Sequence, residues 1–204
     1  FQIMDSLTHL AIGACLGEAL AGKKLGKKAM AWGAVAHSMP DMDVVTALWM
    51  DMPSSLLAHR GLTHSLFFAL LIIPLLAWTA KRWHQQLSMR QWLVFFSATW
   101  LLHLFLDVFN NYGIGWLEPF DYQRFSINAV YVADPFFALG PVMAGLMLLL
   151  LKRKHPKRQF WWKFGLLAGA IYLSYCTFNK VKIDSAFRAA LEQQNIPYTR
   201  YFST

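Results

Sequence analysis

Long apolar runs separated by short basic segments form the main pattern of this chain. A helix needs about 20 largely apolar residues to cross a bilayer, and four runs are long enough: Leu62–Ala80, Gln91–Phe109, Pro135–Leu151 and Trp161–Asn179. Two shorter runs precede them, Leu7–Ala21 and Ala29–Met39. The pattern predicts an all-α, polytopic membrane helical bundle. It has about four full spans, an N-terminal hairpin of short helices and a C-terminal amphipathic helix.

The C-terminal helix is predicted from a different periodicity. In Ile183–Asn195 apolar residues recur at i, i+3, i+4, i+7 and i+8, which is typical of a helix that lies on a membrane surface or packs on the bundle. We therefore expect a membrane-embedded bundle over residues 1–182, with Met4 as the natural start. An amphipathic tail over residues 183–204 follows on the outer side.

The composition agrees with a membrane protein. Hydrophobic residues make up 56% of the 204 residues and charged residues 15%, whereas about a quarter of an average soluble domain is charged. The net charge of +8 would suit a nucleic-acid partner, but the basic residues are concentrated between the apolar runs. Membrane topology explains this placement better, so no nucleic-acid partner is favoured.

The placement of Lys and Arg also predicts the orientation. Loops 22–28, 81–90 and 152–163 hold four, three and six of the 19 basic residues, and cytoplasmic loops carry such an excess. Strict alternation of six segments then places ten of the 11 acidic residues at or near the outer ends, with Glu18 as the exception.

Histidine and aspartate residues from separate segments come to the outer end in this topology. Such residues are costly at membrane depth and usually mark a functional site, and they are also the ligands of catalytic zinc. We predict seven candidate metal ligands: His9, Asp41, Asp43, His59, His64, His103 and Asp107. A single catalytic zinc uses three protein ligands and one water, so seven would suffice for two ions.

Spacing limits how these residues can act. His103 and Asp107 are four apart and share one helix face, so they bind one metal together or the aspartate orients the imidazole. A purely structural His–Asp hydrogen bond is the alternative. His59 and His64 lie about 140° apart on a continuous helix, so we expect a break at Gly61.

Residues around these candidates have possible supporting roles. After Gly61, Thr63 and Ser65 could cap the backbone or steady ligands. Arg60 could clamp an anion such as phosphate through its planar fork, or contact a lipid headgroup.

The carboxylates after Pro40 have several possible roles. Asp41 and Asp43 could bind or bridge metals, or act as general base for a metal-bound water. A turn or cap is the plainer interpretation. His9 could be structural instead, and His37 lies at the same end but is not selected by its spacing.

Asp134 precedes Pro135 at the start of an apolar run. This pattern favours an N-cap, because proline suits the first position of a helix and aspartate accepts hydrogen bonds from its first turn.

Several motifs together resemble the membrane-bound, YdjM-like metal-dependent hydrolases, one member of which is described as LexA-regulated. They are MDSLTH at 4–9, LGEA at 16–19, MPDMD at 39–43, HRGLTHS at 59–65, HLFLD at 103–107 with YG at 112–113, and ADP at 133–135. The chain departs from the family's pattern at His37, where a small residue is expected. His37 is therefore not carried over as a ligand.

The resemblance implies a bacterial inner-membrane enzyme distantly similar to zinc phospholipase C and single-strand nucleases, hence a phosphodiester hydrolase. We expect zinc or another divalent metal, one or two ions, to activate water at the outer leaflet. Asp41 or Asp43 would take the proton and Arg60 would stabilise developing charge, on a lipid or lipid-linked phosphoester. The alternatives are a divalent-metal transporter, a metal-sensing membrane protein, or a structural protein with histidine networks.

Overall fold

The computed structural model describes residues 2–51, 55 and 59–197 of the chain, and most of these residues fold into helices. Two short 3-10 helices, η1 (Pro40–Leu48) and η2 (Leu62–His64), lie between the longer ones. No strand forms in these ranges, and Ile114 and Phe125 make an isolated antiparallel bridge. The α-helices are α1 (Gln2–Leu25), α2 (Lys27–Ser38), α4 (Leu66–Trp83), α5 (Met89–Asp107), α6 (Pro135–Leu150) and α7 (Arg158–Gln193).

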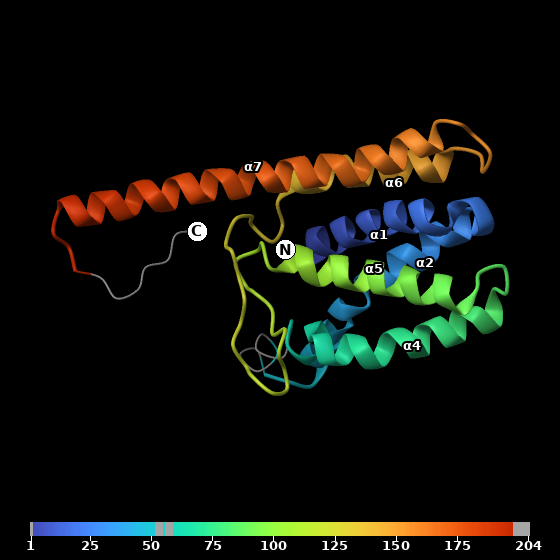
Figure 1. The fold of residues 1–204 in the computed structure, drawn as a ribbon, viewed down its shortest axis with the longest axis horizontal. Coiled ribbons are helices and arrows are strands. Elements are labelled where there is room, and N and C mark those ends of the chain that lie inside the picture. The colour runs from blue at the N-terminus through green and yellow to red at the C-terminus, as the bar shows by residue number, and fades with distance from the viewer. Residues whose placement is uncertain (1, 52–54, 56–58, 198–204) are drawn as a thin grey trace.

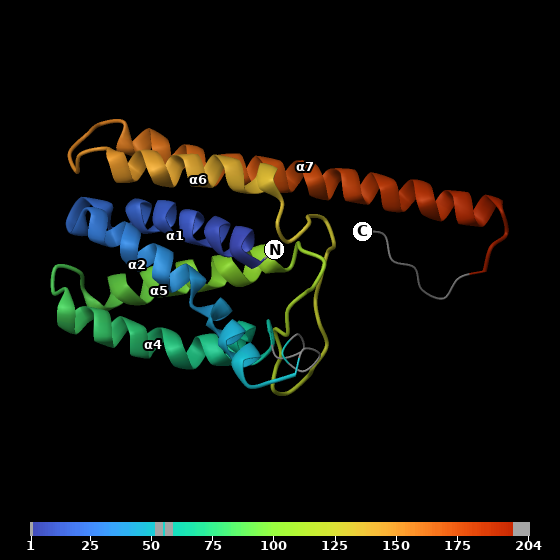
Figure 2. The ribbon, with the colours of Figure 1, turned by 180° about the vertical axis from the view of Figure 1, so that it is seen from behind.

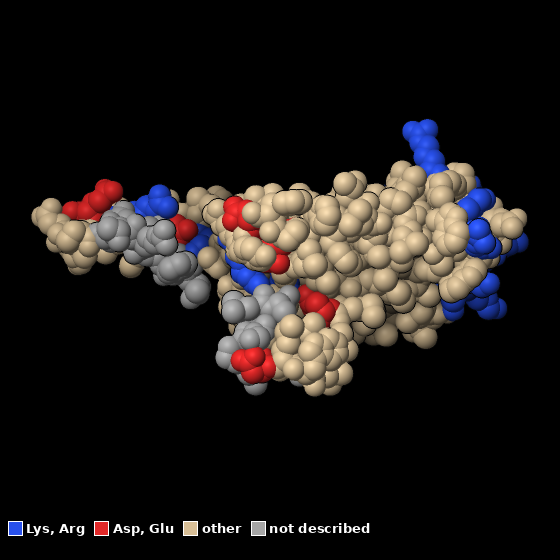
Figure 3. Space-filling model, turned by 90° about the horizontal axis from the view of Figure 1, so that it is seen from below, with Lys and Arg blue, Asp and Glu red and all other residues tan. Residues whose placement is uncertain are grey.

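The α-helices of the described residues lie side by side as a bundle (Figures 1 and 2). The central helix α1 packs against α2, α5, α6 and α7, whereas α4 packs against α5. The turns that join α1 to α2, α4 to α5 and α6 to α7 all lie at one end (Figure 1). Lys and Arg side chains gather at that same end, the right of Figure 3.

Small residues allow α1 and α2 to approach closely. A Cβ atom added at Gly33 of α2 would lie 2.1 Å from the carbonyl oxygen of Gly13 in α1, far inside van der Waals contact. Close approach at glycine is the usual way in which helices pack when both are apolar. Gly26 between the two helices has a φ of 63°, a conformation that glycine adopts without strain.

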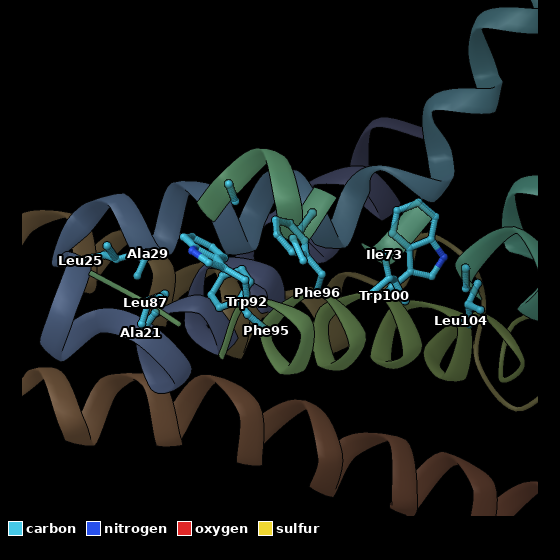
Figure 4. Close-up of a cluster of buried hydrophobic side chains, with 14 of the residues drawn as sticks. Ala21, Leu25, Ala29, Ile73, Leu87, Trp92, Phe95, Phe96, Trp100 and Leu104 are labelled. Carbon is cyan, nitrogen blue, oxygen red and sulfur yellow. The ribbon is translucent and has the colours of Figure 1, made fainter. Parts of the chain in front are cut away.

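The core is built around one face of α5 (Figure 4). Trp92, Phe95, Phe96 and Trp100 are buried against α2 and α4. Buried positions continue along this face at helical spacing to the end of α5, where they include the polar residues His103 and Asp107. The face that packs the core therefore delivers polar side chains to the end of the bundle opposite the basic loops.

A buried ion pair joins three helices near the basic end. Arg158 of α7 donates from Nε and Nη2 to the two carboxylate oxygens of Glu18 in α1, at 2.8 and 2.7 Å. Its Nη1 donates to the carbonyl oxygens of Leu148 and Leu151 at the end of α6. Paired and hydrogen-bonded in this way, both charges are accommodated away from water.

The predicted helical class is confirmed, but the four spans are not. Among the described helices only α4 is both long and apolar enough to cross a membrane, and α6 is apolar but shorter. Helices α5 and α7 cover the other predicted runs, but polar and charged residues along them lower their mean hydropathy.

Two helix lengths differ from the prediction. The N-terminal hairpin does not consist of two short helices, because α1 has 24 residues and packs along the whole bundle. The expected surface helix at 183–195 is not separate either. It continues α7, which is unbroken over 36 residues and projects beyond the bundle (Figure 1). The end of the predicted tail, 198–204, lies outside the described residues.

Candidate metal centre

Four side chains from three elements meet at the end of the bundle opposite the basic loops. Asp41 comes from η1, His64 from η2, and His103 and Asp107 from the last two turns of α5. Three of them are fully buried, and the side chain of Asp41 is 14% exposed. The HxxxD spacing thus places both of its residues in one site, as predicted.

The two Nε2 atoms of this set lie at similar distances from each other and from one oxygen of each aspartate. Nε2 of His64 lies 3.1 Å from Nε2 of His103 and 3.3 Å from both Oδ1 of Asp41 and Oδ2 of Asp107. Nε2 of His103 lies 3.6 and 3.5 Å from the same two oxygens. A tetrahedral zinc ion with ligands at about 2.0–2.1 Å would separate its ligand atoms by about 3.3 Å. The donor set therefore fits a tetrahedral divalent ion in both chemistry and spacing.

The hydrogen bonds of Thr63 indicate which ring nitrogen of His64 carries the lone pair. The Thr63 hydroxyl donates to Oδ2 of Asp43 at 2.7 Å, which uses its single proton. Its oxygen lies 3.1 Å from Nδ1 of His64 and therefore accepts a hydrogen bond from that nitrogen. In the neutral ring Nε2 then carries the lone pair, as a metal ligand must.

The site favours a positive charge. Burial alone would lower the pKa of His64, but Asp107, Asp41 and Asp43 around its ring raise it to about 10. Burial alone would raise the pKa of Asp41, yet the imidazoles of His103 and His64 hold it well below its usual range. Both carboxylate oxygens of Asp41 are buried and accept no hydrogen bond within the described part of the chain. A cation would satisfy them.

Asp43 and His59 pair with each other and lie outside this set. Oδ1 of Asp43 accepts a hydrogen bond from Nδ1 of His59 at 2.6 Å, and Oδ2 accepts from the backbone N–H of Arg60 and from Thr63. Burial would raise the pKa of Asp43, but these histidine contacts, with His64, hold it well below its usual range. With its oxygens occupied, Asp43 fixes the 59–64 loop beside the site.

The chain breaks between His59 and His64, as predicted. Gly61 precedes η2, and Ser65 caps α4 by accepting a hydrogen bond from the backbone N–H of Phe68. Arg60 has a φ of 62°. This conformation, rare for a residue other than glycine, is held by the Asp43 hydrogen bond and by one from Gly115 N–H to the Arg60 carbonyl.

The guanidinium of Arg60 is buried beside the site. The residue is 1% exposed, and its Nε lies 3.7 Å from Oδ2 of Asp107. The side chain is therefore enclosed by the protein and does not extend outward as a contact with lipid headgroups, the alternative interpretation, would require. Its positive charge instead faces the carboxylate that completes the four-residue set.

His9 and His37 lie next to the same set. Nε2 of His9 is 3.2 Å from Oδ1 of Asp107, and His9, His37 and His103 bring three ring nitrogens within 4.8 Å of one another. Sequence reasoning placed His37 at the correct end but did not select it. Its position is recognisable only when α1 and α2 are seen to pack at Gly13 and Gly33.

Asp134 caps α6, as expected, by accepting hydrogen bonds from the N–H groups of Phe136 and Phe137. Tyr172 of α7 donates to its other oxygen at 2.8 Å. The carboxylate is therefore engaged in joining α6 to α7.

Comparison with known proteins gives a family and no solved structure. Residues 4–183 match the YdjM inner membrane protein family. The inner membrane protein YbcI of Escherichia coli (strain K12) is 32% identical over 168 residues, which cover 77% of this chain and 96% of YbcI. The uncharacterized protein YfhP of Bacillus subtilis (strain 168) is 30% identical over 151 residues, 69% of this chain and 45% of YfhP. No solved structure matches.

Proposed function

The chain belongs to the YdjM inner membrane protein family, and from this premise we propose that it is a membrane-embedded, metal-dependent hydrolase. Its substrate is a lipid or lipid-linked phosphoester at the periplasmic leaflet. The observation that carries the proposal is the set of Asp41, His64, His103 and Asp107, whose ligand atoms have the spacing of a tetrahedral metal site. Zinc is the proposed ion because the set mixes imidazole and carboxylate.

A divalent ion held there supplies Lewis-acid chemistry, since it lowers the pKa of water and neutralises charge on a phosphoester. His64, His103 and Asp107 would hold the ion and leave its fourth position, beside Asp41, to water. Thr63 would keep His64 in the required tautomer. Oδ2 of Asp41 is the proposed proton acceptor, because this oxygen accepts no hydrogen bond within the described residues. The other candidate base, Asp43, already accepts three hydrogen bonds.

Arg60 is the proposed stabiliser of negative charge on the phosphoester. Its guanidinium is buried, so little water screens its charge. It lies against Asp107 and not in the bulk solvent, which places a fixed positive charge behind the metal ligands.

The multi-pass arrangement and its orientation belong to the same proposal. The basic connections of the helices lie at one end of the bundle (Figure 3). The metal set, Asp41, His64, His103 and Asp107, lies near the other end. By the excess of Lys and Arg in cytoplasmic loops, the basic end is cytoplasmic and the site periplasmic. A lipid can reach a site at the periplasmic end of the bundle by moving laterally in the membrane, which supports a lipid or lipid-linked substrate.

The packing between the site and the basic end of the bundle supports an enzyme over a transporter. Along α5 the residues preceding His103 on the buried face are Trp100, Thr99, Phe96 and Phe95, and all are fully buried. The hydroxyl of Thr99 donates to the carbonyls of Phe95 and Phe96 in its own helix. A cation moving inward would meet apolar aromatic side chains instead of ligands.

Metal analysis and hydrolysis together test the proposal. Detergent-purified protein should retain at least one equivalent of zinc, His64→Ala should retain one equivalent fewer, and His155→Ala, in the α6–α7 loop, should match the wild type. The zinc-loaded protein should hydrolyse bis(p-nitrophenyl) phosphate or phospholipids in vesicles, and Asp41→Asn should reduce the rate at least about 100-fold. Wild-type protein without bound zinc would contradict the proposal, as would zinc-loaded protein inactive on both substrates.

A further inference from the structure

Three histidines from three helices form a second set beside the metal centre. His9 of α1, His37 of α2 and His103 of α5 are all buried, with exposures of 3, 0 and 0%. Their ring centroids lie 4.2 Å apart for His9 and His103, and 5.2 and 5.3 Å apart for the pairs that include His37. Only His103 belongs to both this set and the first.

Hydrogen bonds orient two of the rings. Nδ1 of His37 lies 2.6 Å from the backbone oxygen of Thr99. A carbonyl only accepts, so Nδ1 carries the proton and Nε2 the lone pair. Nε2 of His9 faces Oδ1 of Asp107 at 3.2 Å, which likewise leaves Nδ1 of His9 as the nitrogen with the lone pair. Carbonyl and carboxylate partners of this kind orient the histidine ligands of metals.

The nitrogens that remain are buried. Neither Nε2 of His37 nor Nδ1 of His103 has a hydrogen-bond partner within the described residues. Leaving a polar atom buried in this way costs about 1–3 kcal/mol, and the lone pair on Nε2 of His37 points to a bound ligand that accepts it.

We propose that His9, His37 and His103 bind a second divalent transition-metal ion, next to the ion of the proposed hydrolase site. Three imidazoles without a carboxylate suit zinc, copper or nickel better than magnesium or calcium, and three histidines plus water form a known type of catalytic zinc site. The inference rests on the proposed function only through His103, whose Nε2 faces the first set and whose Nδ1 is left for the second.

Binding both ions makes His103 a bridge. A neutral imidazole has one lone pair, so the second ion binds His103 only when the ring loses its remaining proton to the buffer. His103 then binds one ion through each nitrogen as an imidazolate. Asp107 contributes to both sites, because Oδ2 faces the first set and Oδ1 orients His9.

Zinc stoichiometry tests the second site separately from the first. Wild-type protein dialysed against zinc in detergent should hold two equivalents, measured by mass spectrometry of the metal. His37→Ala should hold one, and so should His64→Ala, which removes only a ligand of the first set. His155→Ala should hold two. His37→Gln, which keeps most of the side-chain volume next to Gly13, should also hold one and guards against misfolding of the alanine variant.

The outcomes separate the two proposals. If His37→Ala and His37→Gln retain the wild-type number of ions, the second site is wrong. If the wild-type protein holds a single ion that is lost in His64→Ala and kept in both His37 variants, the second site is also wrong, but the proposed hydrolase site stands. Wild-type protein that binds no zinc would overturn both.

Discussion

The hydroxyl of Thr63 donates a hydrogen bond of 2.7 Å to Oδ2 of Asp43. The two residues are 20 positions apart, and their contact joins η1, which follows α2, to η2, which precedes α4. Because the same hydroxyl accepts from Nδ1 of His64, a residue outside the candidate metal set determines the tautomer of one inside it.

Thr63→Val should weaken zinc binding about 10–100-fold, the usual effect of losing a group that orients a metal ligand. The substitution keeps the shape of the side chain and removes only the hydroxyl. The measurement is a competition titration against a chromophoric chelator. Thr79→Val is the matched control, since its hydroxyl bonds only to the Leu75 carbonyl within α4. Equal affinities for the two variants would show that the hydroxyl does not orient His64.

The stability of chelator-treated protein should fall as the pH rises. In the folded protein the pKa of His64 is raised from 6.5 to about 10. A raised pKa means that the folded state binds the proton more tightly than the unfolded state, so this stabilisation is complete below pH 6.5 and is lost as the pH approaches 10. Thermal unfolding in detergent between pH 6 and 10 should show the decline, and His64→Gln should flatten it.

Bound zinc should change that profile. The ion takes the place of the proton on His64, so zinc binding should release a proton. The zinc-loaded protein should then lose less stability between pH 6 and 10 than the chelator-treated protein. Calorimetry in two buffers of different ionisation enthalpy measures the proton release. A binding enthalpy that does not depend on the buffer would contradict this account of the site.

The fold was largely predictable because helix formation depends on local pattern. Each apolar run became a helix, and Asp134 and Ser65 cap helices as such residues usually do. The lengths of α1 and α7 were not predictable in the same way. Apolar content stops near residues 21 and 179, whereas the helical hydrogen bonds continue through the polar residues that follow.

The site was predictable in its location and less so in its partners. Charge distribution brought the seven candidates to one end, but it does not say which side chains face each other. Asp43 turned towards His59 because the backbone N–H of Arg60, in its rare positive φ, points at the same carboxylate. His37 entered the site because glycines bring its helix close to α1. Both facts depend on tertiary contacts.

Glu18→Gln should destabilise the fold without changing its metal content. The substitution leaves the Arg158 guanidinium buried without its carboxylate, and breaking a buried pair in this way costs about 3–5 kcal/mol. Asp184→Asn breaks the more exposed pair with Lys180 and should cost about 0.5 kcal/mol. Thermal unfolding in detergent compares the two variants, and zinc analysis confirms that the site is intact. Similar melting temperatures would show that the Glu18 pair does not hold the bundle together.

The orientation can be tested by single cysteines at the two ends. In a Cys15→Ala and Cys176→Ser background, Tyr122→Cys lies in the exposed loop that follows α5, and Lys154→Cys lies in the basic loop between α6 and α7. Since the excess of Lys and Arg places the basic loops in the cytoplasm, a membrane-impermeant maleimide should label the first variant in intact spheroplasts. It should label the second only after lysis. The opposite pattern would place the metal set on the cytoplasmic side, where a lipid of the outer leaflet could not reach it.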